Sequence, residues 1–65
     1  MKCIKLMGAN AEYEGENLEY TERGVVYIVV DKILFFYDHN VMIADRRIRV
    51  METAEEIAGK LEQMK

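Results

Sequence analysis

Three arginines lie close together in the run DRRIRV. Guanidinium groups hold phosphate and carboxylate groups in a bidentate manner, so the run is a candidate anion site. If it forms a strand, Arg47 and Arg49 share one face about 6.6 Å apart, and Arg46 adds a third charge at the preceding turn. Such a patch would bind a nucleotide, a nucleic acid or an acidic protein. The simpler interpretation, which we favour, pairs the arginines with glutamates of the same chain or of a second subunit.

Negative charge is concentrated in residues 11–23, where five glutamates accompany a single arginine. One interpretation is a solvated acidic loop or an edge hairpin that turns near residues 15–17. The other is a surface that binds another protein, because aromatic side chains of the kind interleaved here are enriched at binding hot spots. The candidate partner-binding residues are Glu12, Tyr13, Glu14, Glu16, Glu19, Tyr20 and Glu22.

Other residue types give little support for catalysis. The chain has no serine, which excludes a Ser-His-Asp arrangement. Cys3 and His39 are the only residues of their types, so a nucleophile–base pair is conceivable. We expect Cys3 to be a buried, inert thiol in an apolar strand and His39 to be a turn residue between Asp38 and Asn40. The sequence therefore predicts no enzyme activity, no catalytic residues, no metal site and no cofactor.

Length and composition set the size of the core. The chain has 65 residues, 51% of them hydrophobic and 32% charged, which predicts one globular domain over residues 1–65. So short a domain buries only about 60% of the surface that its unfolded chain exposes. A single cysteine cannot form an internal disulfide, which fits a cytoplasmic protein, and oligomerisation or a permanent partner is then the remaining source of stability. No apolar run is long enough to span a membrane, and the net charge of −3 disfavours general binding to nucleic acid.

The apolar pattern predicts an α+β fold with a small antiparallel β-sheet of four to five strands and one C-terminal α-helix packed on one face. We expect the sheet in residues 1–52 and the helix in residues 53–65. Thr53 and Glu56 have the spacing of a capping box, and the apolar positions that follow lie at helical spacing. Gly8-Ala9-Asn10 is expected to end the first strand. The strands are expected at residues 1–7, 25–30, 33–37, 41–43 and 47–51.

The predicted helix is too short to cover both faces of this sheet. Residues 25–30 and 33–37 present apolar side chains to both faces, with Leu34 and Phe36 opposite Ile33. An uncovered face of this composition exceeds the apolar patch that monomers tolerate. We therefore expect a homo-oligomer, most simply a dimer. In the alternative, residues 11–23 fold back over this face. The expected interface residues are Val25, Tyr27, Val29, Phe35 and Tyr37.

The stretch YIVVDKILFFYDHNVMIADRRIRVMETAEEIAGKL resembles small flagellar and swarming-motility accessory proteins of bacteria and their prophage-encoded relatives. The shared features are a strand with an Asp-x-Ile element, a hairpin, a strand that ends Val-x-Glu-Ser/Thr, and a helix that opens with paired glutamates. The resemblance covers about two-thirds of the chain and implies an accessory role through protein contacts. The corresponding residues are Asp31, Ile33, Val50, Glu52, Thr53, Glu55 and Glu56.

These observations favour a non-enzymatic, oligomeric protein-interaction module, encoded by a bacterium or a phage, that acts as an accessory or modulator by binding another protein. The alternative is an anion-binding oligomer that binds a nucleotide or nucleic acid through Arg46, Arg47 and Arg49.

Overall fold

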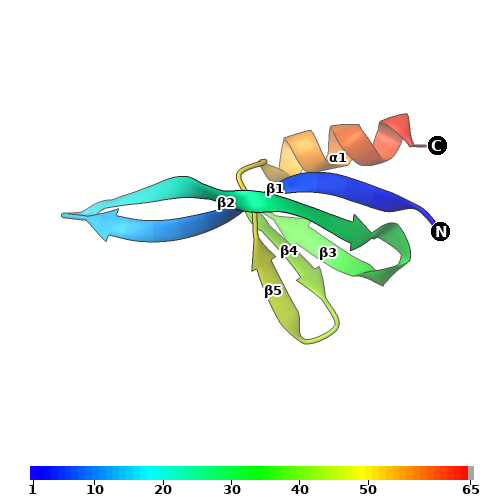
Figure 1. Ribbon diagram of the computed structural model, residues 1–65, viewed down its shortest axis with the longest axis horizontal. Helices are drawn as coiled ribbons and strands as arrows, with labels where there is room; N and C mark the ends of the chain where they lie inside the picture. The colour runs from blue at the N-terminus through cyan, green and yellow to red at the C-terminus, as the bar shows by residue number, and fades with distance from the viewer. Residues whose placement is uncertain (65) are drawn as a thin grey trace.

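A computed structural model describes residues 1–64 of the protein and confirms the α+β class. Five strands, a short 3-10 turn and a C-terminal helix follow one another along the chain (Figure 1). Lys65, which we expected at the end of the helix, lies outside the described residues. The elements are β1 (Cys3–Glu14), β2 (Asn17–Val29), η1 (Val30–Lys32), β3 (Ile33–Tyr37), β4 (Asn40–Ile43), β5 (Arg46–Arg49) and α1 (Ala54–Gln63).

The strands form two antiparallel sheets and not the single sheet that we expected. β1 and β2 pair as a long hairpin, and β3, β4 and β5 form a three-stranded meander. The two sheets meet where Gly8 of β1 bridges Val50, and the Met51 amide donates to the Met7 carbonyl at 2.8 Å. Two short sheets joined at one edge can face each other across a shared core, which one flat sheet cannot do.

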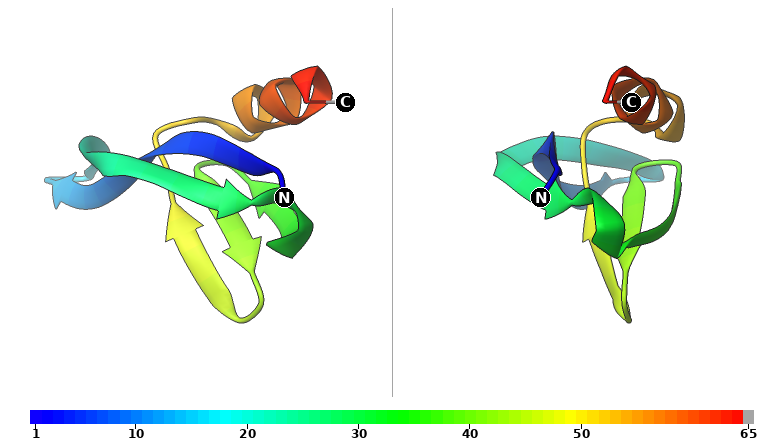
Figure 2. Two further views of the ribbon diagram at one scale, coloured as in Figure 1. Left: turned by 45° about the vertical axis from the view of Figure 1, so that its right-hand side comes forward. Right: turned by 90° about the vertical axis from the view of Figure 1, so that its right-hand side faces the viewer.

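The hydrophobic core lies between these sheets and the helix (Figures 1 and 2). Ile57 of α1 is fully buried in it, and Lys60 donates to the carbonyl of Lys5, so the helix lies along β1. The capping box of Thr53 and Glu56 is present as predicted. Each sheet therefore covers the inner face of the other, and the helix is not the only cover. The core residues are Ile4, Leu6, Ile28, Val41, Val50 and Ile57.

β1 does not end at Gly8, as we expected, but continues to Glu14 through a change in register between Gly8 and Ala9. The backbones of β1 and β2 come so close here that a Cβ on Gly8 would lie 2.9 Å from the carbonyl oxygen of Gly24. Gly24 itself has a φ of +146°, which side chains other than glycine rarely adopt. The two glycines thus allow the ribbon to bend and twist where the sequence suggested a break.

A second irregularity changes which side chains of β3 are buried. The register between β3 and β4 shifts between Ile33 and Phe35, so Ile33 and Phe36 both pack against the core. Leu34, which we expected on the same face as Phe36, is 64% exposed. The strict alternation assumed for residues 33–37 is therefore wrong, because a bulge at Leu34 interrupts the pleat.

The far half of the β1–β2 hairpin, residues 9–23, projects from the body of the molecule, and we call it the acidic arm (Figure 1). It gives the protein a longest dimension of 41 Å against 24 and 19 Å in the other directions. The prediction of an edge hairpin turning at residues 15–17 is confirmed, since Gly15 and Glu16 form the turn. The alternative in which this segment folds back over the sheet is wrong.

Candidate functional site

The acidic arm has one polar face and one apolar face. Its register places Glu12 directly opposite Glu19, and Glu14 directly opposite Asn17, so these side chains share a face. On the other face Tyr13 lies opposite Leu18. Like charges directly opposite each other destabilise a β-ribbon. The polar face therefore favours a cationic neighbour.

Two tyrosines of the arm, both predicted to bind a partner, differ in their surroundings. Tyr13 is 77% exposed near the tip of the arm, beside the partly exposed Leu18. Tyr20 is half-buried at the base, where its ring lies 4.4 Å from the ring of His39. Tyr20 thus helps to fix the arm to the body, and Tyr13 is the aromatic residue available to another molecule. The acids predicted with them, Glu12, Glu14, Glu16, Glu19 and Glu22, are all exposed.

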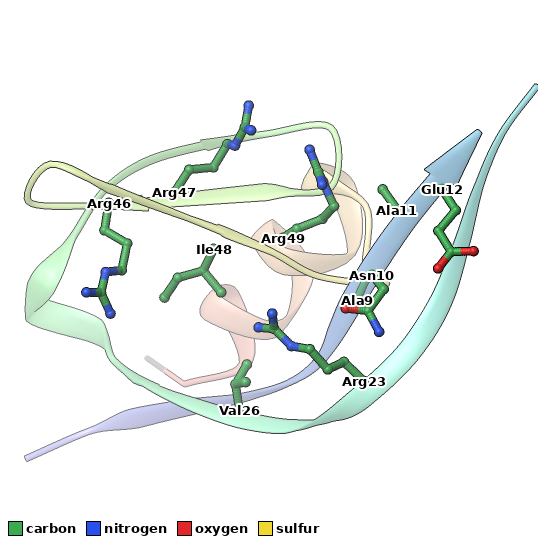
Figure 3. Close-up of a pocket in the computed structure, with 10 residues that line it drawn as sticks. All are labelled: Ala9, Asn10, Ala11, Glu12, Arg23, Val26, Arg46, Arg47, Ile48 and Arg49. Carbon is green, nitrogen blue, oxygen red and sulfur yellow. The ribbon is translucent and has the colours of Figure 1, made fainter.

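The outer face of the three-stranded sheet carries two of the three predicted arginines. Phe35 lies opposite Met42, which lies opposite Arg47, and the next row on this face is Tyr37, Asn40 and Arg49. The rings of Phe35 and Tyr37 are stacked with centroids 6.0 Å apart. Arg46 extends to the opposite side of β5, together with Ile48 (Figure 3). We call the outer surface the arginine face; it consists of Phe35, Tyr37, Met42, Arg47 and Arg49.

A groove of about 620 Å³ separates β5 from the arm (Figure 3). It opens because β1 and β5 diverge beyond the bridge between Gly8 and Val50. Val26 and Ile48 form its apolar part, and Arg23 extends toward it from β2 (Figure 3). We did not predict Arg23 as a site residue. Its lone positive charge among five glutamates was the available signal.

None of the arginines of this region forms an ion pair within residues 1–64, although the net charge of the chain is −3. The expected pairing of Arg46, Arg47 and Arg49 with glutamates of the same chain is therefore not formed in that part of the protein. Asn40 Oδ1, in the row between Tyr37 and Arg49, is buried below this surface without a hydrogen-bond partner. The arginine face thus presents unpaired guanidinium donors and is chemically suited to an anionic partner.

The expected interface residues lie on two surfaces and not on one. Val25 and Tyr27 are exposed on the outside of the β1–β2 hairpin, where Val29 is half-buried. Phe35 and Tyr37 are exposed on the arginine face of the other sheet. The two groups separate because the sheets face each other through their inner sides.

Cys3 and His39, the two residues considered for nucleophilic chemistry, lie at the start of β1 and in the β3–β4 turn. Cys3 is exposed and not buried as we expected, because Ile4 and Leu6 take the inward positions of β1. His39 Nδ1 lies 3.1 Å from the Met51 carbonyl oxygen at the β3–β4 turn, which agrees with the predicted turn role. No group of three or more His, Cys, Asp or Glu side chains within residues 1–64 is arranged to hold a metal ion.

No family model, no curated protein and no solved structure matches this chain. The resemblance to flagellar and swarming-motility accessory proteins therefore remains a prediction. Across the described residues, the structure contains no helix of the length and apolar character needed to cross a membrane.

Proposed function

We propose that the protein is a non-enzymatic, homo-oligomeric interaction module, with a dimer as its simplest form, that acts by binding another protein. The observation that carries this proposal is the exposure of apolar side chains. Eight large hydrophobic residues are each at least 41% exposed within residues 1–64. Phe35 and Tyr37 are neighbours among them on the arginine face, and a contiguous exposed apolar patch marks an interaction site, whereas scattered exposed residues do not. Interfaces are also enriched in aromatic residues, Met and Arg.

The arginine face has the composition of such an interface. Covering the exposed parts of Phe35 and Tyr37 would remove roughly 80 Å² of apolar surface from each, or about 2 kcal/mol per side chain. A twofold dimer contains each contact twice, so these residues would contribute about 8 kcal/mol in total. Association costs on the order of 4–15 kcal/mol in lost freedom of motion. The aromatic pair can therefore support self-association but requires further contacts for a stable dimer.

The tip of the acidic arm is the proposed contact with the second protein. Tyr13 and Leu18 form a directly opposed apolar pair near its end, on the face away from Glu12 and Glu19. An exposed aromatic residue with an aliphatic neighbour, surrounded by acids, is typical of a small binding hot spot with a polar rim. The resemblance noted above supports an accessory role of this kind, bacterial or phage-encoded. The unpaired Cys3 is compatible with the cytoplasm.

Light scattering on two double variants tests the oligomer. The change Phe35→Ser with Tyr37→Ser removes apolar area from the arginine face, and we expect it to weaken self-association by at least about tenfold. The change Tyr13→Ser with Leu18→Ser removes similar side chains from the arm tip and should leave self-association as in the wild type. Equal self-association of both variants and the wild type would remove the basis for the proposed interface.

The arm tip has its own test. Proteins captured from a bacterial lysate by the wild type would be compared with those captured by the Tyr13→Ser, Leu18→Ser variant. We expect the variant to lose a protein that the wild type retains in defined stoichiometry. Identical captured sets would exclude the tip as the contact.

A second candidate function is supported by the unpaired arginines. In this alternative the oligomer binds a nucleotide or nucleic acid through Arg46, Arg47 and Arg49. Arg47 and Arg49 lie on the face of Phe35 and Tyr37, which are available for stacking on bases, and Arg46 contributes from the other side of β5. Binding of a labelled single-stranded oligonucleotide that weakens steeply with salt, and that Arg47→Glu with Arg49→Glu abolishes, would favour this alternative. Absence of oligonucleotide binding at low salt would exclude nucleic acid as the ligand.

A further inference from the structure

The arginine face and the acidic arm are complementary parts of one chain that do not contact each other through ion pairs. Arg47 and Arg49 extend to the same side of β5, as Figure 3 shows, and neither has a carboxylate partner within residues 1–64. The same figure shows the groove between β5 and the chain's own arm, which Arg47 and Arg49 line from β5 and Glu12 lines from β1, with no ion pair across it among the described residues. The positive charge of this face is therefore available to a group from outside the chain.

The spacing of charges on the arm matches that on the face. Glu12 and Glu14 are two residues apart on β1 and share a face, as Arg47 and Arg49 do on β5. At about 3.3 Å per residue, both pairs are separated by roughly 6.6 Å. Two carboxylates can therefore meet two guanidinium groups at once, without distortion of either strand.

The arm itself has a physical need for a partner. A two-stranded ribbon without a further layer is marginally stable in water. Here it also carries Glu12 directly opposite Glu19, which adds repulsion between like charges. A positively charged surface against this polar face would supply the missing layer and would also offset the repulsion between the two glutamates.

Free strand edges lie beside both sets of charges. β5 is the edge strand of its sheet, and β1 pairs on only one side beyond its bridge to Val50. Unpaired edges of this kind are templates for an additional strand. The arm of another molecule can therefore approach β5 closely enough for side chains of both strands to meet.

We infer that in the homo-oligomer the acidic arm of each copy lies on the arginine face of a second copy, with Glu12 and Glu14 against Arg47 and Arg49. This inference rests on the proposed self-association and names the segment that completes it. A twofold arrangement makes the contact reciprocal, because each copy offers one arm and one face. The opposite side of the arm, with Tyr13 and Leu18, stays free for a different protein. A second copy is favoured over nucleic acid because the five glutamates of the chain's own arm would repel a polyanion.

Charge reversal on two variants, followed by mixing, tests the contact. Variant one carries Arg47→Glu and Arg49→Glu, and variant two carries Glu12→Arg and Glu14→Arg. Each alone brings like charges together, and we expect its dimer dissociation constant to rise at least about tenfold. An equimolar mixture should recover wild-type association as a heterodimer, because each arm then meets a face of opposite charge. The control Asp31→Arg with Glu55→Arg makes the same change in net charge as variant two at exposed sites outside the arm.

Sedimentation velocity on each sample and on the mixture, with circular dichroism to verify folding, distinguishes the outcomes. Recovery in the mixture alone supports the inference, since pairing within one chain cannot be restored by a second chain. If the wild type self-associates and both reversals leave it unchanged, the inference is wrong and the proposed oligomer stands. A monomeric wild type overturns both. Salt-dependent oligonucleotide binding, lost in variant one while self-association persists, assigns the face to nucleic acid and overturns the inference.

Discussion

A pair of glycine-to-alanine substitutions is expected to change stability in opposite directions. At Gly8 the added Cβ would lie 2.9 Å from the backbone oxygen of Gly24 and 3.3 Å from Cγ1 of Val26. At Gly59, in the exposed part of α1, it would meet no atom within 4 Å. The chemical change is the same at both sites, so the difference isolates the effect of the surroundings.

The magnitudes follow from these contacts. Overpacking a closely approached backbone costs about 1–3 kcal/mol, and the reduced freedom of the unfolded chain offsets roughly 0.4–1 kcal/mol of it. We therefore expect Gly8→Ala to destabilise the protein by about 1–2 kcal/mol. For Gly59→Ala, helix propensity predicts stabilisation by about 1 kcal/mol. In a domain of this size, each kcal/mol corresponds to a shift of about 4–8 °C in Tm.

Thermal unfolding followed by circular dichroism measures both shifts. The wild type and the two variants must be compared at one protein concentration, because Tm depends on concentration in a self-associating protein. A lower Tm for Gly8→Ala together with a higher Tm for Gly59→Ala would agree with the described backbone approach. A Gly8→Ala variant as stable as the wild type would refute the close passage of β1 and β2 at the base of the arm.

Three further predictions concern single positions. Ala44 has a φ of +46°, so the change Ala44→Gly should relieve backbone strain. We expect it to raise the free energy of unfolding in urea by about 1 kcal/mol, and a lower value would contradict the strained turn. Thr53 Oγ1 accepts from the Glu56 amide at 3.3 Å, so Thr53→Ala should cost about 1 kcal/mol by the same assay, and no change would mean that the cap is not formed. Cys3 is exposed, so a thiol reagent should label it completely without denaturant, and protection would show that a second copy or partner covers it.

Local features of the fold could be predicted because short-range chemistry determines them. The capping box of Thr53 and Glu56 depends on two side chains three residues apart, and it is present. The alternation of Arg47, Ile48 and Arg49 follows from the pleat of one strand, and it is also correct. These features do not depend on the rest of the chain.

Features set by contacts between distant segments could not be predicted. Gly8 suggested a strand end, but its role is to let β1 pass close to Gly24, which is sixteen positions away in the sequence. The bulge at Leu34 reverses the expected orientation of neighbouring side chains, and nothing in the run ILFFY indicates it. The division into two sheets, which meet at the bridge between Gly8 and Val50, is also set by long-range pairing. The sequence-based estimate of how many sheet faces stay uncovered therefore assumed the wrong arrangement.

In the candidate site too, local features could be predicted from the sequence and long-range features could not. Its residue types were evident from the sequence, since the arginine run and the acidic segment are the regions of concentrated charge. Their arrangement was not, because the grouping of Arg47 with Phe35 depends on pairing across three strands. Arg23 lines the groove from the position that the register shift leaves unpaired, between the partners of Gly8 and Ala9.

The mass of the unmodified protein in solution tests the central claim most directly. Sedimentation equilibrium from about 1 to 100 μM covers the range in which interfaces of moderate size associate. We predict a mass that rises with concentration toward twice the 7.6 kDa of the chain and that falls again at high salt. A constant mass of 7.6 kDa across this range would contradict the account, because the arginine face and the acidic arm would then have no second copy to contact.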